Sequence, residues 1–292
     1  MEYGIENSKL KVSISTKGAQ MKSIRNQAGK EFLWQGSKNT WEESAPNLFP
    51  YVGRLTKETY TLHGREYHMG IHGFAMLKEF TILEQKEDCI TFILEADEET
   101  IIQYPFIFQF CVTYRLQENE IIITYEVHNN SNQAMYFGLG GHPGFNVPIN
   151  DKLTFEDYVI EFEDQTEPIQ IGMSEDCFVT ENNRKFVLEE GKYLHLKHDL
   201  FDHDAIILQN MGNKVTLKSE KGKEEITVFF SNMKYLGIWH WPKTIVDYIC
   251  IEPWTSLPAR KDVVEELTTQ KDLIKLEAKR KYNNRFSIRI CS

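Results

Sequence analysis

Hydrophobic and polar residues alternate along most of this chain. The segments 10–14 and 90–94 are short examples, in which every second residue is a leucine, isoleucine, valine or phenylalanine. A period of two places alternate side chains on one face of a β-strand. The pattern therefore predicts a chain built mainly of half-buried strands.

Three pairs of strands are predicted from neighbouring alternating segments. The longest is "FIFQFCVTYRLQENEIIITYEVHNN" (106–130), where the polar "QENE" forms the turn of an antiparallel hairpin. The segment "KVTLKSEKGKEEITVFF" (214–230) predicts a second hairpin, and "YLGIWHW" (235–241) with "DYICIEPW" (247–254) predicts a further pair. Helical periodicity is scarce, and "ARKDVVEEL" (259–267) is the one short candidate.

These elements predict an all-β fold of packed antiparallel sheets in a large sandwich, with few short helices. The sequence shows no repeat of fixed period and no low-complexity linker, so we expect one domain over residues 1–292. The acidic, less regular stretch 154–199 is expected to form a solvated rim with edge strands.

Composition narrows the class of partner. The 292 residues are 41% hydrophobic, and 33 Lys and Arg stand against 43 Asp and Glu, a formal net charge of -10. This charge disfavours nucleic acid and anionic membranes. Five cysteines without C-x-x-C spacing, and a start without a basic segment followed by an apolar stretch, predict a cytoplasmic protein with reduced thiols.

The segment "GLGGHPGFNVPI" (138–149) surrounds His142 with glycines and prolines. A phosphate loop would open into a helix, which Pro143 and Pro148 oppose. We expect positive φ at one or more of the four glycines, Gly138, Gly140, Gly141 and Gly144. The bends would project His142 into a pocket.

Other polar residues interrupt the alternation in similar contexts. They are Arg54 in "NLFPYVGRL", His72 in "GIHGF" and Glu252 in "CIEPWTSLP". Glu252 follows the apolar "YICI", and a carboxylate at the end of a buried strand is either paired or functional. His72 and Arg54, taken singly, fit ordinary surface loops better than a functional site.

Together these stretches resemble the aldose 1-epimerase family, also called galactose mutarotase-like proteins, and in particular its LacX-like branch. The matching segments are "APNLFPYVGRL", "IHGFAMLKEF", "GGHPGFNVPI", "LFDHDAIIL" and "IEPWTSLP", in the family's order across residues 45–258. The resemblance implies a large antiparallel β-supersandwich, which agrees with the strand pattern.

The resemblance also implies roles for individual residues. Glu252 would be the general base and His142 the general acid, while Arg54, His72 and Asp204 would bind the sugar. Asp202 is the competing acid for the last of these positions. The resemblance also implies that no cofactor is needed. No metal is expected, because the histidines at 63, 68 and 72 lack metal-site spacing. Trp239, Trp241 and Trp254 are either core residues or an apolar wall for the sugar.

The expected reaction is the interconversion of the α and β anomers of an aldohexose, a small-molecule substrate, by a monomer or homodimer. Two alternatives remain: a hexose 6-phosphate as substrate, with extra cations at the pocket rim, or a carbohydrate-binding or sensing protein without turnover. Lys57, Arg65 and Lys78 are the candidate rim cations. Glycoside cleavage would require two carboxylates, which the motifs do not clearly supply.

Overall fold

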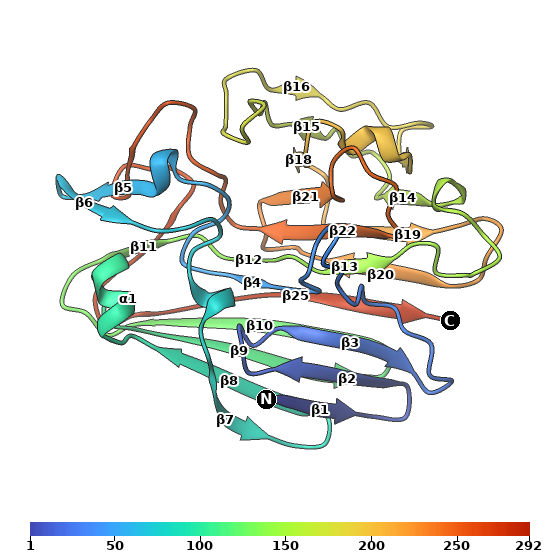
Figure 1. The fold of residues 1–292 in the computed structure, drawn as a ribbon, viewed down its shortest axis with the longest axis horizontal. Coiled ribbons are helices and arrows are strands. Elements are labelled where there is room, and N and C mark those ends of the chain that lie inside the picture. Colours follow the sequence, from blue (N-terminus) through green and yellow to red (C-terminus); the bar gives the residue numbers. More distant parts are fainter.

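The computed structural model describes residues 1–292, and strands make up nearly all of its regular structure (Figure 1). The largest sheet has nine antiparallel strands. In spatial order they are β17 (Tyr193–His195), β14 (Val159–Phe162), β19 (Lys214–Lys218), β20 (Glu225–Phe229), β25 (Lys281–Cys291), β10 (Glu120–Asn129), β9 (Phe108–Gln117), β8 (Cys89–Glu95) and β7 (Thr81–Gln85).

A second sheet of eight strands lies in the upper half of Figure 1, with its strands running across the view. Its order is β16 (Arg184–Lys185), β15 (Ile169–Gln170), β18 (Ile206–Gln209), β21 (Tyr235–Trp239), β22 (Tyr248–Trp254), β12 (Gly140–Gly141) and β4 (Asn47–Leu48), and β13 (Gly144–Asn146) also pairs with β22. The fold is therefore the all-β, multi-sheet architecture that the alternation predicts.

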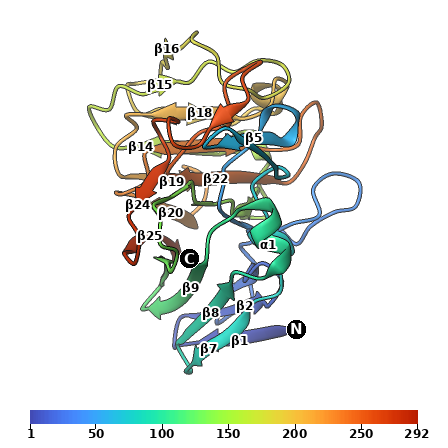
Figure 2. The same ribbon diagram turned by 90° about the vertical axis from the view of Figure 1, so that its left-hand side faces the viewer.

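Three smaller sheets complete the molecule. The N-terminal sheet lies beside β7–β9 in Figures 1 and 2. It contains β1 (Glu2–Glu6), β2 (Leu10–Ser15) and β3 (Met21–Asn26). A second small sheet contains β5 (Thr59–Leu62), β6 (Arg65–His68) and β23 (Glu265–Glu266). The third is the pair of β11 (Met135–Phe137) and β24 (Ile274–Leu276). One hydrophobic cluster of 67 buried residues includes side chains from the first strands to the last, so these sheets share a core.

The predicted hairpins are confirmed. In β10 the buried residues alternate without a break, and Ile121 and Ile123 lie opposite Leu116 and Tyr114 of β9. β19 pairs with β20, and β21 with β22, each antiparallel as expected. Residues 154–199 supply β16 and β17, each of which forms one edge of a large sheet.

The predicted helix at 259–267 is wrong. This segment forms turns and the short strand β23, which pairs in parallel with β5. Glu265 is 1% exposed and receives two hydrogen bonds from the Arg260 guanidinium, so its carboxylate is committed to a tertiary contact. Asp262 has a φ of 60°, which ends any helical turn there.

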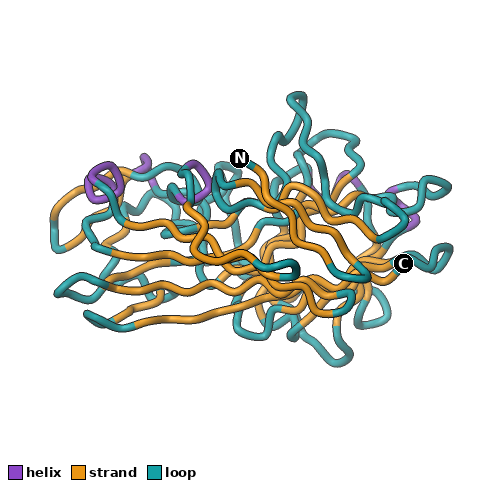
Figure 3. Tube along the Cα trace, turned by 90° about the horizontal axis from the view of Figure 1, so that it is seen from below, coloured by secondary structure: helices purple, strands orange, loops and turns teal.

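Helical structure occurs elsewhere and in short pieces, outside the strand layers (Figure 3). α1 (Glu98–Gln103) is capped at its N-terminus by Asp97, whose side chain accepts from the Thr100 N–H in a capping box. Four single turns of 3₁₀ helix cover Thr56–Glu58, Ala75–Leu77, Phe155–Asp157 and His198–Phe201. None of these helices is long and apolar enough to cross a membrane.

Candidate active site

A pocket of about 290 Å³ opens beside β22. The walls include all five residues that the sequence nominates: Arg54, His72, His142, Asp204 and Glu252. Arg54 and Glu252, the outermost of the five, are 198 positions apart in the sequence, so only the tertiary fold brings these residues together. Asp202 is not among the lining residues, whereas Asp204 is.

Glu252 lies in the centre of a strand that is buried along its whole length. β22 has neighbours on both sides, with β21 along one edge and β12 and β13 along the other. The residue opposite Glu252 in β21 is Gly237. Glu252 is 1% exposed, and its Oε2 has no hydrogen-bond partner. A buried carboxylate without a partner is costly unless a ligand completes its environment.

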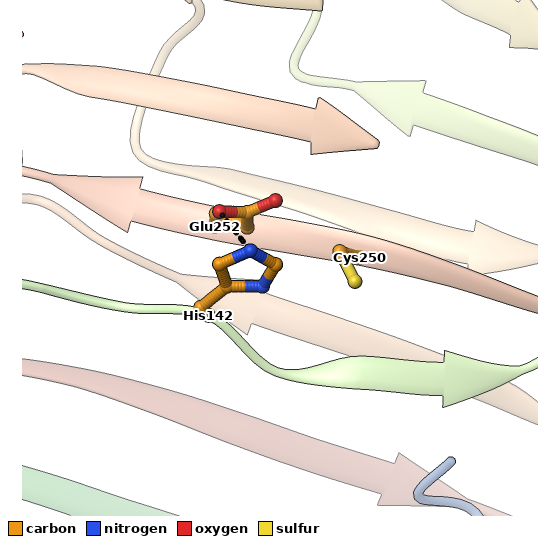
Figure 4. Close-up of side chains that lie close together, drawn as sticks. All are labelled: His142, Cys250 and Glu252. Carbon is orange, nitrogen blue, oxygen red and sulfur yellow. Dashed lines mark ion pairs between the residues drawn. The ribbon is translucent and has the colours of Figure 1, made fainter. Parts of the chain in front are cut away.

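His142 lies in the connection between β12 and β13, where its backbone N–H donates to the Pro46 carbonyl at 3.0 Å. Figure 4 shows its ring beside β22, with Nε2 directed at Glu252. His142 Nε2 and Glu252 Oε2 are 3.2 Å apart, but the approach lacks the alignment of a hydrogen bond. His142 Nδ1 is also buried without a partner. The pocket thus contains two facing groups with free hydrogen-bonding capacity.

Burial shifts the pKa values of these two groups in opposite directions. Loss of water lowers the pKa of His142 well below its usual value, and nearby His72 adds to the shift. The same loss raises the pKa of Glu252 well above its usual value, and the charge of Asp204 adds to that shift. Both changes disfavour the charged forms. Near neutral pH we therefore expect the His142–Glu252 pair to hold one proton, and burial favours its position on the Glu252 carboxyl.

The glycines around His142 are required for close packing, and the expectation of positive φ at them is wrong. None of the four has a positive φ. A Cβ on Gly141 would lie 2.5 Å from Cζ of Phe286, and one on Gly144 would lie 2.7 Å from Cζ3 of Trp41. Only glycine lets these strands approach the aromatic side chains so closely.

His72 and Arg54 stand next to each other on the pocket wall. The Gly53 N–H donates to His72 Nδ1 at 3.1 Å, so the neutral ring carries its proton on Nε2. Burial, with a contribution from the Arg54 charge, lowers the pKa of His72 to about 4. His72 is therefore a neutral donor near pH 7, and Arg54 is the single lysine or arginine that lines the pocket. Lys57, Arg65 and Lys78 lie outside the lining.

Asp204 is held from two sides. Its Oδ1 accepts from the Ala205 N–H at 2.7 Å, and Cys177 Sγ donates to its Oδ2 at 3.1 Å. Burial and the adjacent carboxylate raise the pKa of the Cys177 thiol to about 12, so the thiol keeps its proton as a donor. Cys177 lines the pocket but does not belong to any of the sequence motifs.

An aromatic group covers one side of the His142 ring. Trp41 stacks on the imidazole with ring centroids 4.8 Å apart and an interplanar angle of 26°. Trp239 meets the same ring edge-on at 5.6 Å. Trp239, Trp241 and Trp254 all line the pocket, as does Trp41. Sequence reasoning missed Trp41, because it lies in the irregular segment "KNTWEESAP" without strand or motif context.

A third side chain with a metal-binding atom lies beside His142 and Glu252. Cys250, two residues before Glu252 on β22, places its sulfur within 4.8 Å of ligand atoms on His142 and Glu252 (Figure 4). Metal ligands must lose their protons. Burial raises the pKa of both Cys250 and Glu252 well above usual values, which favours their protonated forms. A metal at these three side chains would therefore have to displace both protons on binding.

Fold and pocket define a galactose mutarotase-like protein, and comparison with known proteins gives the same result. Residues 1–266 match the family described as Aldose 1-epimerase. The chain is 32% identical over 265 residues to the chromosomal LacX protein of Lactococcus lactis subsp. lactis, covering 88% of each chain. The chain belongs to the aldose 1-epimerase family.

Two solved structures resemble the whole chain. One is a galactose mutarotase related enzyme from Lactobacillus acidophilus, with a TM-score of 0.96, 34% identity and coverage of 100% of this chain and 98% of that one. The other is a galactose mutarotase-like protein from Lactobacillus casei, with a TM-score of 0.95, 31% identity and complete coverage of both chains. The fold implied by the sequence motifs is therefore confirmed.

Proposed function

We propose that this enzyme of the aldose 1-epimerase family interconverts the α and β anomers of a neutral aldohexose in this pocket. The observation that carries the proposal is the pair of buried, facing groups, His142 Nε2 and Glu252 Oε2, 3.2 Å apart, each group with a polar atom that lacks a hydrogen bond. Ring opening of a hemiacetal needs one group that removes a proton and one that supplies a proton.

The reaction proceeds through the open-chain aldehyde. Glu252, as carboxylate, removes the proton of the C1 hydroxyl while His142, as imidazolium, protonates the ring oxygen. The C1–O1 bond becomes a carbonyl and the bond from C1 to the ring oxygen breaks. After rotation about C1–C2, the ring oxygen attacks the other face, and both protons return. Atoms and charge balance, and the pair regains its starting protonation.

The resting proton distribution fits this cycle. Because burial favours a protonated Glu252 and a neutral His142, the pair already holds the single proton that the reaction uses. Transfer of this proton from the carboxyl to the imidazole, whose Nε2 lies 3.2 Å from Glu252 Oε2, requires the two groups to come into alignment and gives the reactive ion pair. Sugar hydroxyls that donate to the carboxylate stabilise its charged form. Each proton-transfer partner contributes about 10²- to 10⁴-fold to the rate.

The remaining polar residues would hold the sugar. His72 offers an Nε2–H donor, Arg54 a charged donor and Asp204 an acceptor, and all three line the same pocket. Trp239 and Trp241 add apolar surface suited to the C–H face of a pyranose. These roles follow the family pattern at matching positions, and the shared pocket supports them.

The charges in the pocket favour a neutral sugar over a hexose 6-phosphate. A phosphate group requires several cations or backbone donors, and Arg54 is the one cationic side chain of fixed charge in the lining. The Asp204 carboxylate lines the same pocket and would repel a phosphate, as would Glu252 in its ionised, reactive form. Retention of an acid–base pair that simple binding does not need also favours turnover over sensing.

The five cysteines are free, which fits a protein of the reducing cytoplasm. We infer that the protein is a monomer or a homodimer, and light scattering of the purified protein tests this oligomeric state.

Polarimetry tests the function directly. Freshly dissolved α-anomers of neutral aldohexoses and of hexose 6-phosphates are followed with and without enzyme, against the buffer rate. We expect acceleration with neutral sugars, and a loss of about 10²-fold or more in kcat for Glu252→Gln and for His142→Asn. The double variant should be barely slower than either single variant. A wild-type enzyme that acts only on phosphorylated sugars, or single variants with full kcat, would overturn the proposal.

A further inference from the structure

Trp254 contributes an unpaired hydrogen-bond donor to the same pocket. Its side chain lines the cavity and is 4% exposed, and its indole Nε1 is buried without a partner. A buried N–H without an acceptor requires an explanation, such as a group that is ligated only in the functional state. Trp254 follows Glu252 by two positions on β22, so both side chains project from the same face of the sheet.

The indole is fixed between two glycines. A Cβ on Gly140, in β12, would lie 2.7 Å from Cδ1 of Trp254. A Cβ on Gly237, in β21, would lie 2.9 Å from Cζ2 of Trp254 and 3.4 Å from Cβ of Glu252. Cδ1 and Cζ2 flank the Nε1 edge of the ring, so this edge lies in a slot that the two glycines create beside Glu252.

We propose that Trp254 is the positioning residue of Glu252, and that its indole N–H donates to the carboxylate whenever Glu252 is ionised, in the free as in the sugar-bound enzyme. This inference rests on the proposed function and goes beyond it, because it explains how a fully buried carboxylate reaches its reactive form. Burial and the Asp204 charge raise the pKa of Glu252, and Trp254 acts in the opposite direction. A donor to the charged form favours that form.

The slot also explains the two glycines. Gly237 lies directly opposite Glu252, and Gly140 opposite Trp254, in the strands that flank β22. Neither glycine has a positive φ, so backbone conformation does not require them. Their lack of a side chain leaves the space in which the N–H edge can approach the carboxylate.

The test compares Trp254→Phe with wild type in two independent measurements. Phenylalanine keeps an aromatic ring in the slot but removes the N–H. With ¹³C-labelled glutamate, and Glu252→Gln to assign the signal, the Glu252 carboxyl should titrate on the order of one pH unit higher in Trp254→Phe, a tenfold change in its ionisation constant. On sugar, the maximal kcat/KM should fall about tenfold for the same reason, with its alkaline limb moved upward.

Matched variants separate this role from a structural one. Trp34→Phe also removes an indole N–H, one that donates to the Trp41 carbonyl at 3.0 Å, and should leave the Glu252 titration in place. Gly237→Ala keeps the N–H but displaces the indole, and should shift the titration in the same direction as Trp254→Phe. Thermal unfolding confirms that each variant is folded.

An unchanged Glu252 titration in both folded Trp254→Phe and Gly237→Ala overturns the inference, even if wild type is an active mutarotase. A wild-type enzyme without activity on any sugar overturns the proposed function instead, while the carboxyl titration still tests the Trp254 contact.

Discussion

His142 and Glu252 face each other across 3.2 Å, and burial lowers the pKa of the histidine while it raises the pKa of the glutamate. In water the carboxyl would lose its proton at lower pH than the imidazolium. In this pocket burial shifts the two pKa values toward the reverse order. The apparent pKa values in the pH profile of kcat/KM then describe the coupled titration of both groups, and neither value belongs to one residue alone.

This reversal predicts the origin of each limb of the pH profile. kcat/KM should be bell-shaped, with an acidic limb that coincides with titration of the His142 ring and an alkaline limb that coincides with the Glu252 carboxyl. Titration followed by ¹⁵N signals of His142 and ¹³C signals of Glu252 checks this against kinetics. A carboxyl that titrates on the acidic limb would contradict this assignment of the two limbs.

Burial of Glu252 should lower stability as the pH rises. The unfolded carboxyl ionises near its ordinary pKa of 4.5, while the folded one keeps its proton to higher pH, so the unfolded state binds fewer protons between the two values. Folding stability is then lost across this window. Glu252→Gln does not ionise, so its Tm advantage over wild type should grow from about pH 4.5 upward, as measured by calorimetry. An advantage that does not change with pH would contradict the raised pKa.

Trp41 should control the hydration of His142. Its ring stacks on the imidazole, and desolvation is the main cause of the lowered His142 pKa. In Trp41→Leu, water reaches the ring, so the His142 pKa should rise toward 6.5 and the acidic limb of kcat/KM should move to higher pH. Trp41→Phe keeps a stacked ring and serves as the control. If the acidic limb of kcat/KM lies at the same pH in wild type, Trp41→Leu and Trp41→Phe, then Trp41 serves only in packing.

Cys177 should act on substrate binding through Asp204. Its thiol donates to Oδ2 at 3.1 Å, and a hydrogen bond to a charged group contributes about 1.5–3 kcal/mol. Cys177→Ala should therefore raise KM, by up to about tenfold, with a smaller effect on kcat. Cys177→Ser retains a donor and should remain within a few-fold of wild type. Serine and alanine variants with the same KM would argue against this contact.

Cys250, whose sulfur lies close to His142 and Glu252, permits a test for a bound metal. If acid–base chemistry suffices, extensive treatment with a chelator should leave kcat unchanged, and Cys250→Ala should keep kcat/KM within a few-fold of wild type. Loss of activity that a divalent ion restores in wild type, but not in Cys250→Ala, would instead assign a metal to His142, Cys250 and Glu252.

The local pattern of the sequence determined the strands and much of the pocket. Alternation sufficed for the hairpins because one face of each strand must be apolar to be buried, as in β9 and β10. Motifs that break the alternation nominated Glu252 and His142, since polar residues inside or next to buried strands have few structural reasons to be there. All five nominated residues then line one pocket.

Tertiary structure decided what depends on neighbours distant in the sequence. The segment 259–267 has helical periodicity, but Glu265 is buried against Arg260, and this contact outweighs weak helix propensity. The glycines near His142 are needed because Phe286 and Trp41 approach them, which no local pattern encodes. The same holds for Trp41, Cys177 and the unpaired indole of Trp254. The reversed pKa order of His142 and Glu252 likewise arises only when packing removes water from both groups.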